Sequence, residues 1–282
     1  MIDGNFLKQL NKLSLIINKK ITSGFIGNRA TRSVGSGLVF GDYATYSLGD
    51  DFRSIDWKVY SRTERLYVKR YEQDKNITVH VLVDFSASMA FGEDIKKYEY
   101  ASRLGLGFVY LAIKNNEKYV FSTFSDKLEF FKPLKGKNSL ASMINYLNKK
   151  KPKGLSNLWE SMSNYRSLID SISLVVLISD FFYDITQIRN VLYKYKKNEI
   201  ILIQVLDPIE KNLSLEGDFN LMDLESNSKL RTFITPALRN KYLEKMKLHS
   251  LELQKTCDGV KAKFYTISTN EDIFDVFYRI LV

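Results

Sequence analysis

A continuous apolar stretch at residues 77–83 constrains the fold of this chain more than any other part of its sequence. It reads Ile-Thr-Val-His-Val-Leu-Val and has the length of one β-strand. Strands that are apolar on both faces are typical of the centre of a parallel sheet, which helices cover on both sides. The stretch ends abruptly in the oxygen-rich sequence Asp84-Phe85-Ser86-Ala87-Ser88. The sequence therefore predicts a central strand whose carboxyl end carries several polar side chains.

The side chains of Asp84, Ser86 and Ser88 are spaced two residues apart. In an extended chain, residues at this spacing point to the same side, so the three oxygen-bearing groups can converge on one point. Open α/β sheets bind their ligands in the crevice beyond the carboxyl ends of the strands. Spacing and position together predict a ligand site. The simpler alternative is a strand-end turn that is capped by one aspartate and two serines.

Two later stretches repeat this pattern of an apolar strand that ends in an acid. Residues 174–178 lead into Ser179-Asp180, and residues 199–206 lead into Asp207-Pro208. Segments with apolar residues at helical spacing alternate with the predicted strands, at residues 96–114, 139–151 and 185–196. This alternation predicts an α/β fold with a Rossmann-like, doubly wound, mainly parallel sheet.

The chain after Pro208 interrupts that alternation. A predicted hairpin and a long polar helix form an insertion at about residues 209–258, and a last strand and helix follow at residues 263–267 and 272–281. We interpret residues 77–282 as one domain that includes this insertion.

Residues 1–76 differ in character from the rest of the chain. Residues 5–18 have the apolar stripe of an amphipathic helix, and glycines punctuate residues 24–49 as they do in turns and short strands. Acids and Arg53 interleave in residues 49–57. We interpret this region as a small turn- and strand-rich lobe, pinned by ion pairs and by aspartates that bind the backbone. The alternative is a recognition surface.

Composition limits the classes of protein that the chain can belong to. Of its 282 residues 45% are hydrophobic, which is enough for a full core. The single cysteine, Cys257, excludes an internal disulfide and suits a reducing compartment. The start of the sequence lacks the pattern of a signal peptide, and no apolar run approaches the ~20 residues of a membrane span. We therefore expect a cytoplasmic protein with no membrane span.

The oxygen-bearing side chains expected at the carboxyl edge of the sheet form one candidate metal site. Its members are Asp84, Ser86, Ser88, Ser156 and Asp180. Hydroxyls and carboxylates are hard ligands that suit Mg²⁺ or Mn²⁺. Because at most two acids face the ion, it would keep positive charge and an unfilled position. A site of this kind favours an acidic side chain from a protein partner.

Catalysis and nucleic-acid binding are the two alternatives to a protein-interaction function. The chain has two histidines, neither beside a predicted nucleophile, and it lacks a P-loop. Hydrolysis at two metals would need more acids at the same edge, so we expect no enzyme, and a metal-dependent phosphohydrolase is the weaker alternative. The net charge of +10 favours nucleic acid, but the lysines are spread along the whole chain.

Two motifs resemble those of a known family. Asp84-Phe85-Ser86-Ala87-Ser88-Met89 resembles the metal-ion-dependent adhesion site (MIDAS) of von Willebrand factor A domains. Ser156 stands where that family usually has threonine, and Asp180 stands at its later aspartate. Residues 49–57, with Ser61-Arg62 after them, are similar to the signature of a bacterial subfamily catalogued as domain of unknown function fifty-eight.

The resemblance extends well over residues 35–180 and loosely beyond. It implies a von Willebrand factor A-like fold with a Mg²⁺-dependent protein-binding face. Members of the subfamily look like partners of MoxR-type AAA+ ATPases, with chaperone-like roles in the assembly or maturation of other proteins. The chain lacks the flanking membrane helices of some relatives, which implies a cytoplasmic member.

Overall fold

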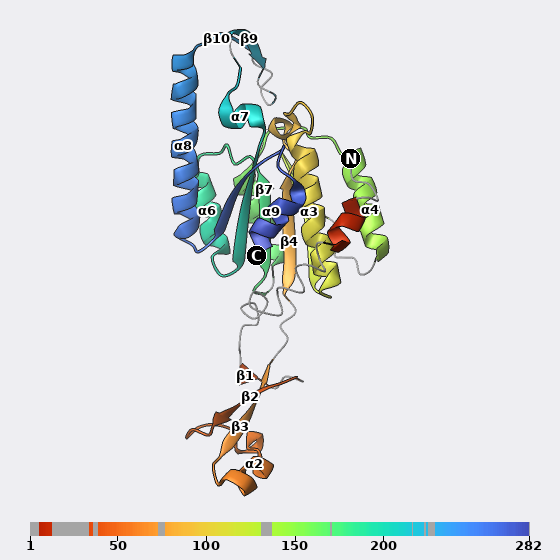
Figure 1. Cartoon of the computed structure of the whole chain (residues 1–282), viewed down its shortest axis with the longest axis vertical. Coiled ribbons are helices and arrows are strands. Elements are labelled where there is room, and N and C mark those ends of the chain that lie inside the picture. Colours follow the sequence, from red (N-terminus) through yellow and green to blue (C-terminus); the bar gives the residue numbers. More distant parts are fainter. Residues whose placement is uncertain are drawn as a thin grey trace. The chain divides into compact units, whose positions relative to one another are not determined.

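The computed structural model describes residues 6–12, 34–35, 39–72, 77–130, 137–169, 171–215, 217–222, 224 and 229–281. These residues form two compact units (Figure 1). One unit comprises residues 16–76 and is called the lobe below. The other comprises residues 1–15 and 77–281 and is called the sheet unit.

A six-stranded sheet forms the centre of the sheet unit, with the order β11-β8-β7-β4-β5-β6. Its strands are β4 (Thr78–Asp84), β5 (Lys118–Phe124), β6 (Leu128–Phe130), β7 (Leu174–Ser179), β8 (Glu199–Leu206) and β11 (Lys263–Ser268). All neighbours pair in parallel except β5 and β6, which form an antiparallel pair. The predicted α/β fold with a doubly wound, mainly parallel sheet is confirmed, and β4 is the central strand that the apolar stretch predicted.

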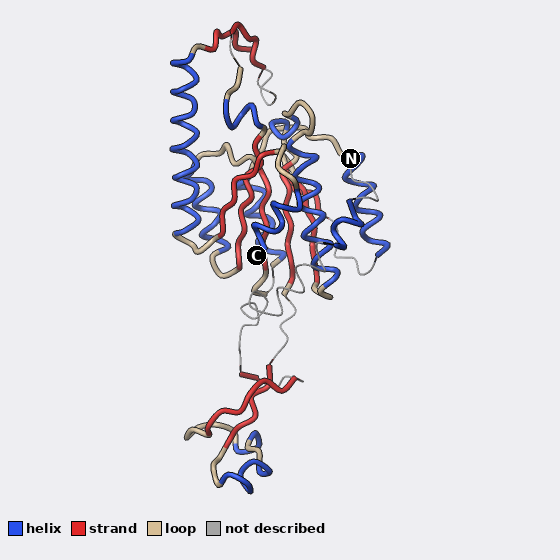
Figure 2. The backbone as a smooth tube through the Cα atoms, viewed as in Figure 1, coloured by secondary structure: helices blue, strands red, loops and turns tan. Residues whose placement is uncertain are grey.

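Helices cover both faces of this sheet (Figure 2). Strand β4 explains why, because its side chains alternate between two apolar environments. Val81 and Val83 face α3 (Lys97–Lys114), where a Cβ on Gly105 would lie 2.9 Å from a methyl carbon of Val83. Leu82, on the opposite face, belongs to a cluster with α5 and α6. Gly105 therefore allows α3 to pack closely against β4.

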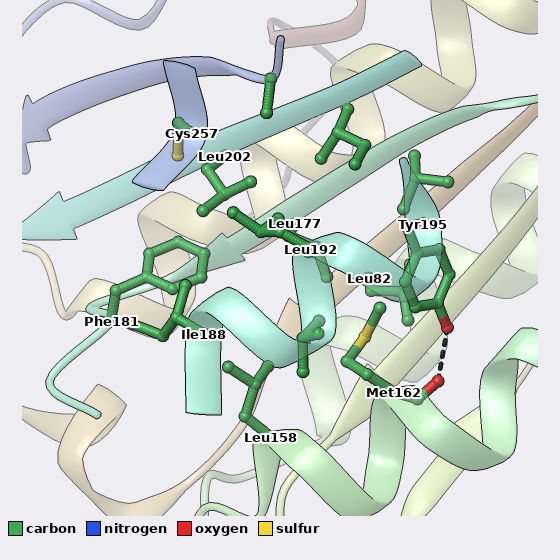
Figure 3. Packing of buried hydrophobic residues seen from close by; sticks show 14 of the residues in the cluster. Leu82, Leu158, Met162, Leu177, Phe181, Ile188, Leu192, Tyr195, Leu202 and Cys257 are labelled. Atoms are coloured by element: carbon green, nitrogen blue, oxygen red, sulfur yellow. Dashed lines mark hydrogen bonds between the residues drawn. The ribbon is translucent and has the colours of Figure 1, made fainter. Parts of the chain in front are cut away.

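Leu82 belongs to a cluster of buried hydrophobic residues, part of which Figure 3 shows. Leu177 of β7 and Leu202 of β8 extend it along the sheet. Helices α5 (Leu158–Tyr165) and α6 (Ile185–Tyr195) close it, and the Tyr195 hydroxyl donates a hydrogen bond to the carbonyl of Met162. The packing fixes the carboxyl ends of β4 and β7 side by side.

The remaining helices and the hairpin complete the sheet unit. They are η2 (Ala87–Ala90), α4 (Lys137–Lys149), η3 (Arg166–Leu168), α7 (Pro208–Asn212), β9 (Gly217–Met222), β10 (Lys229–Ile234), α8 (Pro236–Asp258) and α9 (Ile273–Leu281). In the described part of the chain, β9 and β10 pair with each other and with no strand of the six-stranded sheet. Among the described residues, none of the helices combines the length and apolar character that a membrane span needs.

The N-terminal helix packs within the sheet unit. Residues 6–12 are helical, Leu10 is buried, and the ring of Phe6 lies 6.0 Å from that of Phe274. The Tyr110 hydroxyl also donates to Asn11 Oδ1. The sequence analysis grouped this helix with the lobe, whereas in the structure it belongs to the sheet unit and contacts α9 through Phe6 and α3 through Asn11. The rest of the predicted helix, residues 13–18, lies outside the described residues.

The lobe contains an antiparallel sheet of order β1-β3-β2. Its elements are β1 (Val34–Gly35), β2 (Val39–Thr45), η1 (Phe52–Ser54), α2 (Trp57–Thr63) and β3 (Tyr67–Glu72). Its acids bind the backbone as predicted: Asp50 accepts from Ser47 N, Asp51 caps η1, and Asp56 caps α2. The buried Asp56 also accepts from the Tyr43 hydroxyl and pairs with Lys69 Nζ at 3.0 Å. The interleaved acids of residues 49–57 therefore shape the lobe.

Candidate functional site

The predicted site residues lie where the strand order of the sheet reverses. From β4 the chain passes through α3 to β5 on one side, whereas β7 and β8 lie on the other side. Such a switch point leaves a crevice beyond the strand ends, and ligands of open α/β sheets bind there. Asp84 is the last residue of β4, and Asp180 directly follows β7. The sheet thus places both acids at this crevice.

The carboxylate of Asp84 is completely buried and accepts hydrogen bonds on both oxygens. Oδ1 accepts from the backbone N of Ser86 at 2.8 Å. Oδ2 accepts from the hydroxyls of Ser179 at 2.7 Å, Tyr183 at 2.6 Å and Ser156 at 3.2 Å. The hydroxyls of Ser156 and Tyr183 also contact each other. One buried carboxylate therefore gathers three hydroxyls from two separate parts of the chain, the Ser156 loop and the segment of Ser179 and Tyr183.

Ser86 and Ser88 extend this cluster along the loop after β4. The Oγ atoms of the two serines lie 3.1 Å apart. Ser86 is buried, whereas Ser88 is half-buried, as Ser156 and Tyr183 are. The structure therefore brings together four of the five predicted residues through hydrogen bonds, with partly accessible hydroxyls above a buried carboxylate.

Ser156 reaches Asp84 because its loop is tied to the loop after β4. Lys153 N donates to the carbonyl of Phe85 at 2.9 Å, and Ala87 N donates to the carbonyl of Gly154 at 3.0 Å. Gly154 has φ +80°, a conformation that favours glycine. These backbone bonds join segments that are about 70 residues apart and fix the Ser156 hydroxyl at the crevice.

Asp180, the fifth predicted residue, is engaged differently. Its Oδ2 lies 2.9 Å from Nζ of Lys97, whose ammonium is also 2.7 Å from Oε1 of Glu210. Lys97 is completely buried and Asp180 almost completely so. No hydrogen bond joins the side chains of Asp180 and Asp84 among the described contacts, but their charges interact. Asp180 therefore belongs to an ion-paired triad that borders the hydroxyl cluster.

Four residues of this region were missed by the sequence analysis. Ser179 precedes Asp180 and Tyr183 follows it closely, so the strand-end segment did carry oxygens that were not counted. Glu210 had a local signal, because Asp207-Pro208-Ile209-Glu210 forms a capping box at the start of α7. Lys97 had none, since a lysine at the start of a helix is ordinarily exposed.

Burial and neighbouring charges shift the pKa values of these groups. Burial, together with repulsion from Asp180, raises the pKa of Asp84 despite its hydroxyl donors. Burial also raises the pKa of Glu210 against the attraction of Lys97. For Lys97, burial lowers the pKa, but attraction to Asp180 and Glu210 outweighs it and the net shift is upward. Burial and the charge of Asp84 raise the pKa of Tyr183 well above its usual range, so the phenol stays protonated.

The donor chemistry of the cluster fits a small divalent cation. Asp84, Ser86, Ser88 and Ser156 supply only hard oxygen ligands, the kind that Mg²⁺ and Mn²⁺ prefer. Within the described part of the chain, no three histidine, cysteine, aspartate or glutamate side chains are grouped for a metal. Any ion in the crevice would thus rely on serine hydroxyls. The ion pair of Asp180 with Lys97 is the one departure from the expected donor set.

The two histidines lie outside the hydroxyl cluster. His80 is buried in β4 with Nδ1 2.8 Å from the Tyr165 hydroxyl, and the two rings meet edge to face. His249 of α8 has Nε2 2.8 Å from the carbonyl of Phe181. His80 thus serves the core, and His249 links α8 to the segment that follows β7.

Fold and site together define an α/β protein with a doubly wound sheet and a cluster of hydroxyls and carboxylates at the carboxyl edge of that sheet. The chain belongs to the family described as protein of unknown function DUF58, which matches residues 42–252. The family resemblance found in the sequence is therefore confirmed. The match spans the signature of the lobe, the Asp84 loop and most of α8.

Relatives with similar sequences occur in mycobacteria. The uncharacterized proteins Rv1480 of Mycobacterium tuberculosis and Mb1516 of Mycobacterium bovis are each 25% identical over 275 residues, which cover 96% of this chain and 87% of theirs. Among solved structures, the hypothetical protein BatB from Bacteroides thetaiotaomicron is 12% identical, with 72% of this chain and 96% of that chain covered and a TM-score of 0.44. The SpRpn10 VWA domain is 10% identical, with 72% and 94% covered and a TM-score of 0.44.

Proposed function

We propose that the crevice binds Mg²⁺ or Mn²⁺ and that the chain is a non-enzymatic, metal-dependent protein-interaction module. The observation that carries this proposal is the buried Asp84 carboxylate with the hydroxyls of Ser156 and Tyr183 on a single oxygen. A carboxylate at the end of a central strand is costly to bury unless a cation or several donors compensate its charge. Ser86 and Ser88 complete a ligand set of hard oxygens at the same place.

An acidic side chain is the partner group that this crevice fits best. Asp84 is the only carboxylate in the hydroxyl cluster, because Lys97 already pairs with Asp180. A dication held by one carboxylate and several hydroxyls keeps positive charge, which attracts a further carboxylate. That carboxylate would come from a protein partner.

Apolar side chains next to the crevice add a second recognition element. Phe182 is 44% exposed and directly follows Asp180, and Leu155 is 60% exposed and directly precedes Ser156. Exposed apolar side chains beside a charged anchor are typical of binding sites. The fitting partner segment therefore carries an aspartate or glutamate flanked by apolar residues. From the family resemblance, a MoxR-type AAA+ ATPase is the partner we propose to test first, with the chain acting as its adaptor in the assembly or maturation of other proteins.

Capture of that ATPase by the immobilised full chain tests the proposal. Wild type should retain a MoxR-type ATPase from the same organism in Mg²⁺ and release it in EDTA, and Asp84→Asn should retain none. Asp184→Asn is the matched control, because Asp184 is exposed and caps α6 through an oxygen that asparagine keeps. Mg²⁺ should also raise the melting temperature of wild type and of the control but not of Asp84→Asn. Capture that survives both EDTA and Asp84→Asn would show that no metal mediates the contact.

A further inference from the structure

Lys97 is a buried charge for which the proposed function gives no role. It is the first residue of α3, and its side chain is withdrawn from solvent. The rings of Phe91 and Phe182 lie over its ammonium, with centroids 6.0 and 5.6 Å from Nζ. Burying an ammonium is unfavourable unless opposite charges compensate it. Because Lys97 pairs with Asp180 next to the Asp84 cluster, its positive charge acts on any ion that the cluster binds.

Two carboxylates hold the ammonium from the ends of neighbouring strands. Asp180, after β7, contacts Nζ at 2.9 Å, and Glu210, after β8, contacts it at 2.7 Å. Glu210 is itself fixed, because its second oxygen accepts from the backbone N of Asp207 at 3.0 Å. The ion pair occupies Oδ2 of Asp180, whereas Oδ1 accepts a hydrogen bond from the backbone N of Phe182 at 3.4 Å. Lys97 therefore occupies the oxygen of Asp180 that takes no backbone hydrogen bond among the described contacts.

The charges around the crevice can be counted. Asp84, Asp180 and Glu210 contribute three negative charges and Lys97 one positive charge, which gives −2 when all are ionised. Without Lys97 the same group would carry −3. A fixed ammonium repels a second cation in the same low-dielectric region. Lys97 thus opposes the cation that Asp84 attracts.

We propose that Lys97 is a positioning residue that withholds one oxygen of Asp180 and limits the affinity of the crevice for a divalent cation. This inference rests on the proposed function and deepens it, because it states why the site needs a partner. The ion is held weakly by the chain alone and firmly only when a partner adds its own carboxylate. The ion pair with Asp180 and Glu210 makes this a built-in property of the site.

Titration calorimetry with Mn²⁺ alone, on the full chain at pH 8, tests the role of Lys97. Lys97→Met removes the charge and should raise the affinity roughly ten-fold or more. Glu210→Gln removes one negative charge and should lower the affinity below that of wild type. The double variant restores the count of −2 and should return close to wild type. The expected affinity for Mn²⁺ is highest in Lys97→Met, intermediate in wild type and the double variant, and lowest in Glu210→Gln. A purely structural role of Lys97 would not produce this order.

Lys96→Met is the matched control, because Lys96 is the exposed neighbour that precedes α3. It should bind Mn²⁺ as wild type does. Lys97→Met leaves two buried carboxylates unpaired, so thermal melting must show that it folds. If it does not fold, the remaining proteins still define two charge states, −1 in Glu210→Gln and −2 in wild type and the double variant.

The outcomes separate the two proposals. If wild type binds Mn²⁺ but the affinities of the variants do not follow their net charges, the role of Lys97 is overturned and the metal site stands. Absence of binding in wild type and in every variant overturns both. Tighter binding by Lys97→Met, reversed in the double variant, supports the role of Lys97.

Discussion

The hydroxyl of Tyr183 lies 2.6 Å from Oδ2 of Asp84 and donates a hydrogen bond to this completely buried carboxylate. Tyr183 comes from the segment after β7, and Asp84 is the end of β4. The bond therefore ties together the two strand ends that border the crevice. Since the pKa of Tyr183 is raised, the phenol keeps its proton and remains a donor.

Tyr183→Phe should destabilise the protein when no divalent cation is present. A hydrogen bond to a charged group contributes about 1.5–3 kcal/mol to the free energy of unfolding. The substitution leaves Asp84 with fewer donors and keeps the packing of the ring. Urea unfolding in EDTA measures the effect. Tyr193→Phe serves as the control because Tyr193 is exposed on α6, and it should change the stability little. Equal stability of both variants would show that the bond to Asp84 contributes nothing.

Gly107 sets how closely α9 approaches α3. A Cβ on Gly107 would lie 2.1 Å from a ring carbon of Phe277, which no side chain tolerates. Gly107→Ala should therefore lower the free energy of unfolding by about 1–3 kcal/mol, the usual cost of overpacking. Phe277→Leu in the same chain should recover part of that loss. Gly259→Ala is the control, since its nearest atoms lie at 3.5 Å or beyond. A Gly107→Ala variant as stable as wild type would contradict this packing of α9.

The sequence predicted the sheet well because its strands are apolar on both faces. The apolar run of β4 and the oxygen-rich loop that begins at Asp84 can both be recognised from the local sequence alone. The close approach of Gly107 to Phe277 was not predictable, because only the position of α9 reveals it. Periodicity identifies which face of a helix is buried and leaves open which element covers it.

The site was predicted less completely than the fold. Strand-end oxygens are visible in sequence, and Ser156 was grouped with them before the family resemblance added support for it. Lys97 was not predictable, since its burial depends on two acids that lie 83 and 113 residues further along the chain. Long-range charge compensation of this kind has no local signature. The contact of Asp180 with Lys97 therefore had to come from the structure.

Asp56 makes the stability of the lobe depend on pH in the acid range. Its hydrogen bonds with Lys69 and Tyr43 lower its pKa from 3.8 to about 2. Because the folded-state pKa is the lower one, the stabilisation is fully present above 3.8 and is lost as the pH falls toward 2. Asp56→Asn keeps the cap of α2 and removes the charge that pairs with Lys69. Wild type should be the more stable protein at neutral pH, and the difference should vanish near pH 2.

The two tryptophans of the chain make this measurement specific to the lobe. With Trp159→Phe as the background, Trp57 at the start of α2 is the sole tryptophan and reports on the lobe by fluorescence. Asp50→Asn is the control, because Asp50 is exposed and only binds the nearby backbone. If the difference in stability between Asp56→Asn and its background persists unchanged down to pH 2, the ionised carboxylate of Asp56 is not its cause.

Cys257 should resist alkylation for as long as the protein is folded. It is the only cysteine, it is completely buried, and burial raises the pKa of its thiol to about 12. Both effects suppress the reactive thiolate. Iodoacetamide labelling at pH 8 should therefore follow the unfolded fraction as urea increases, with Cys257→Ser as the unlabelled control. Because Cys257 lies in α8 and packs in the cluster with Leu202 and Leu253 (Figure 3), protection would show that the end of the predicted insertion belongs to the core. Equal labelling of folded and unfolded protein would place this end of α8 outside the core.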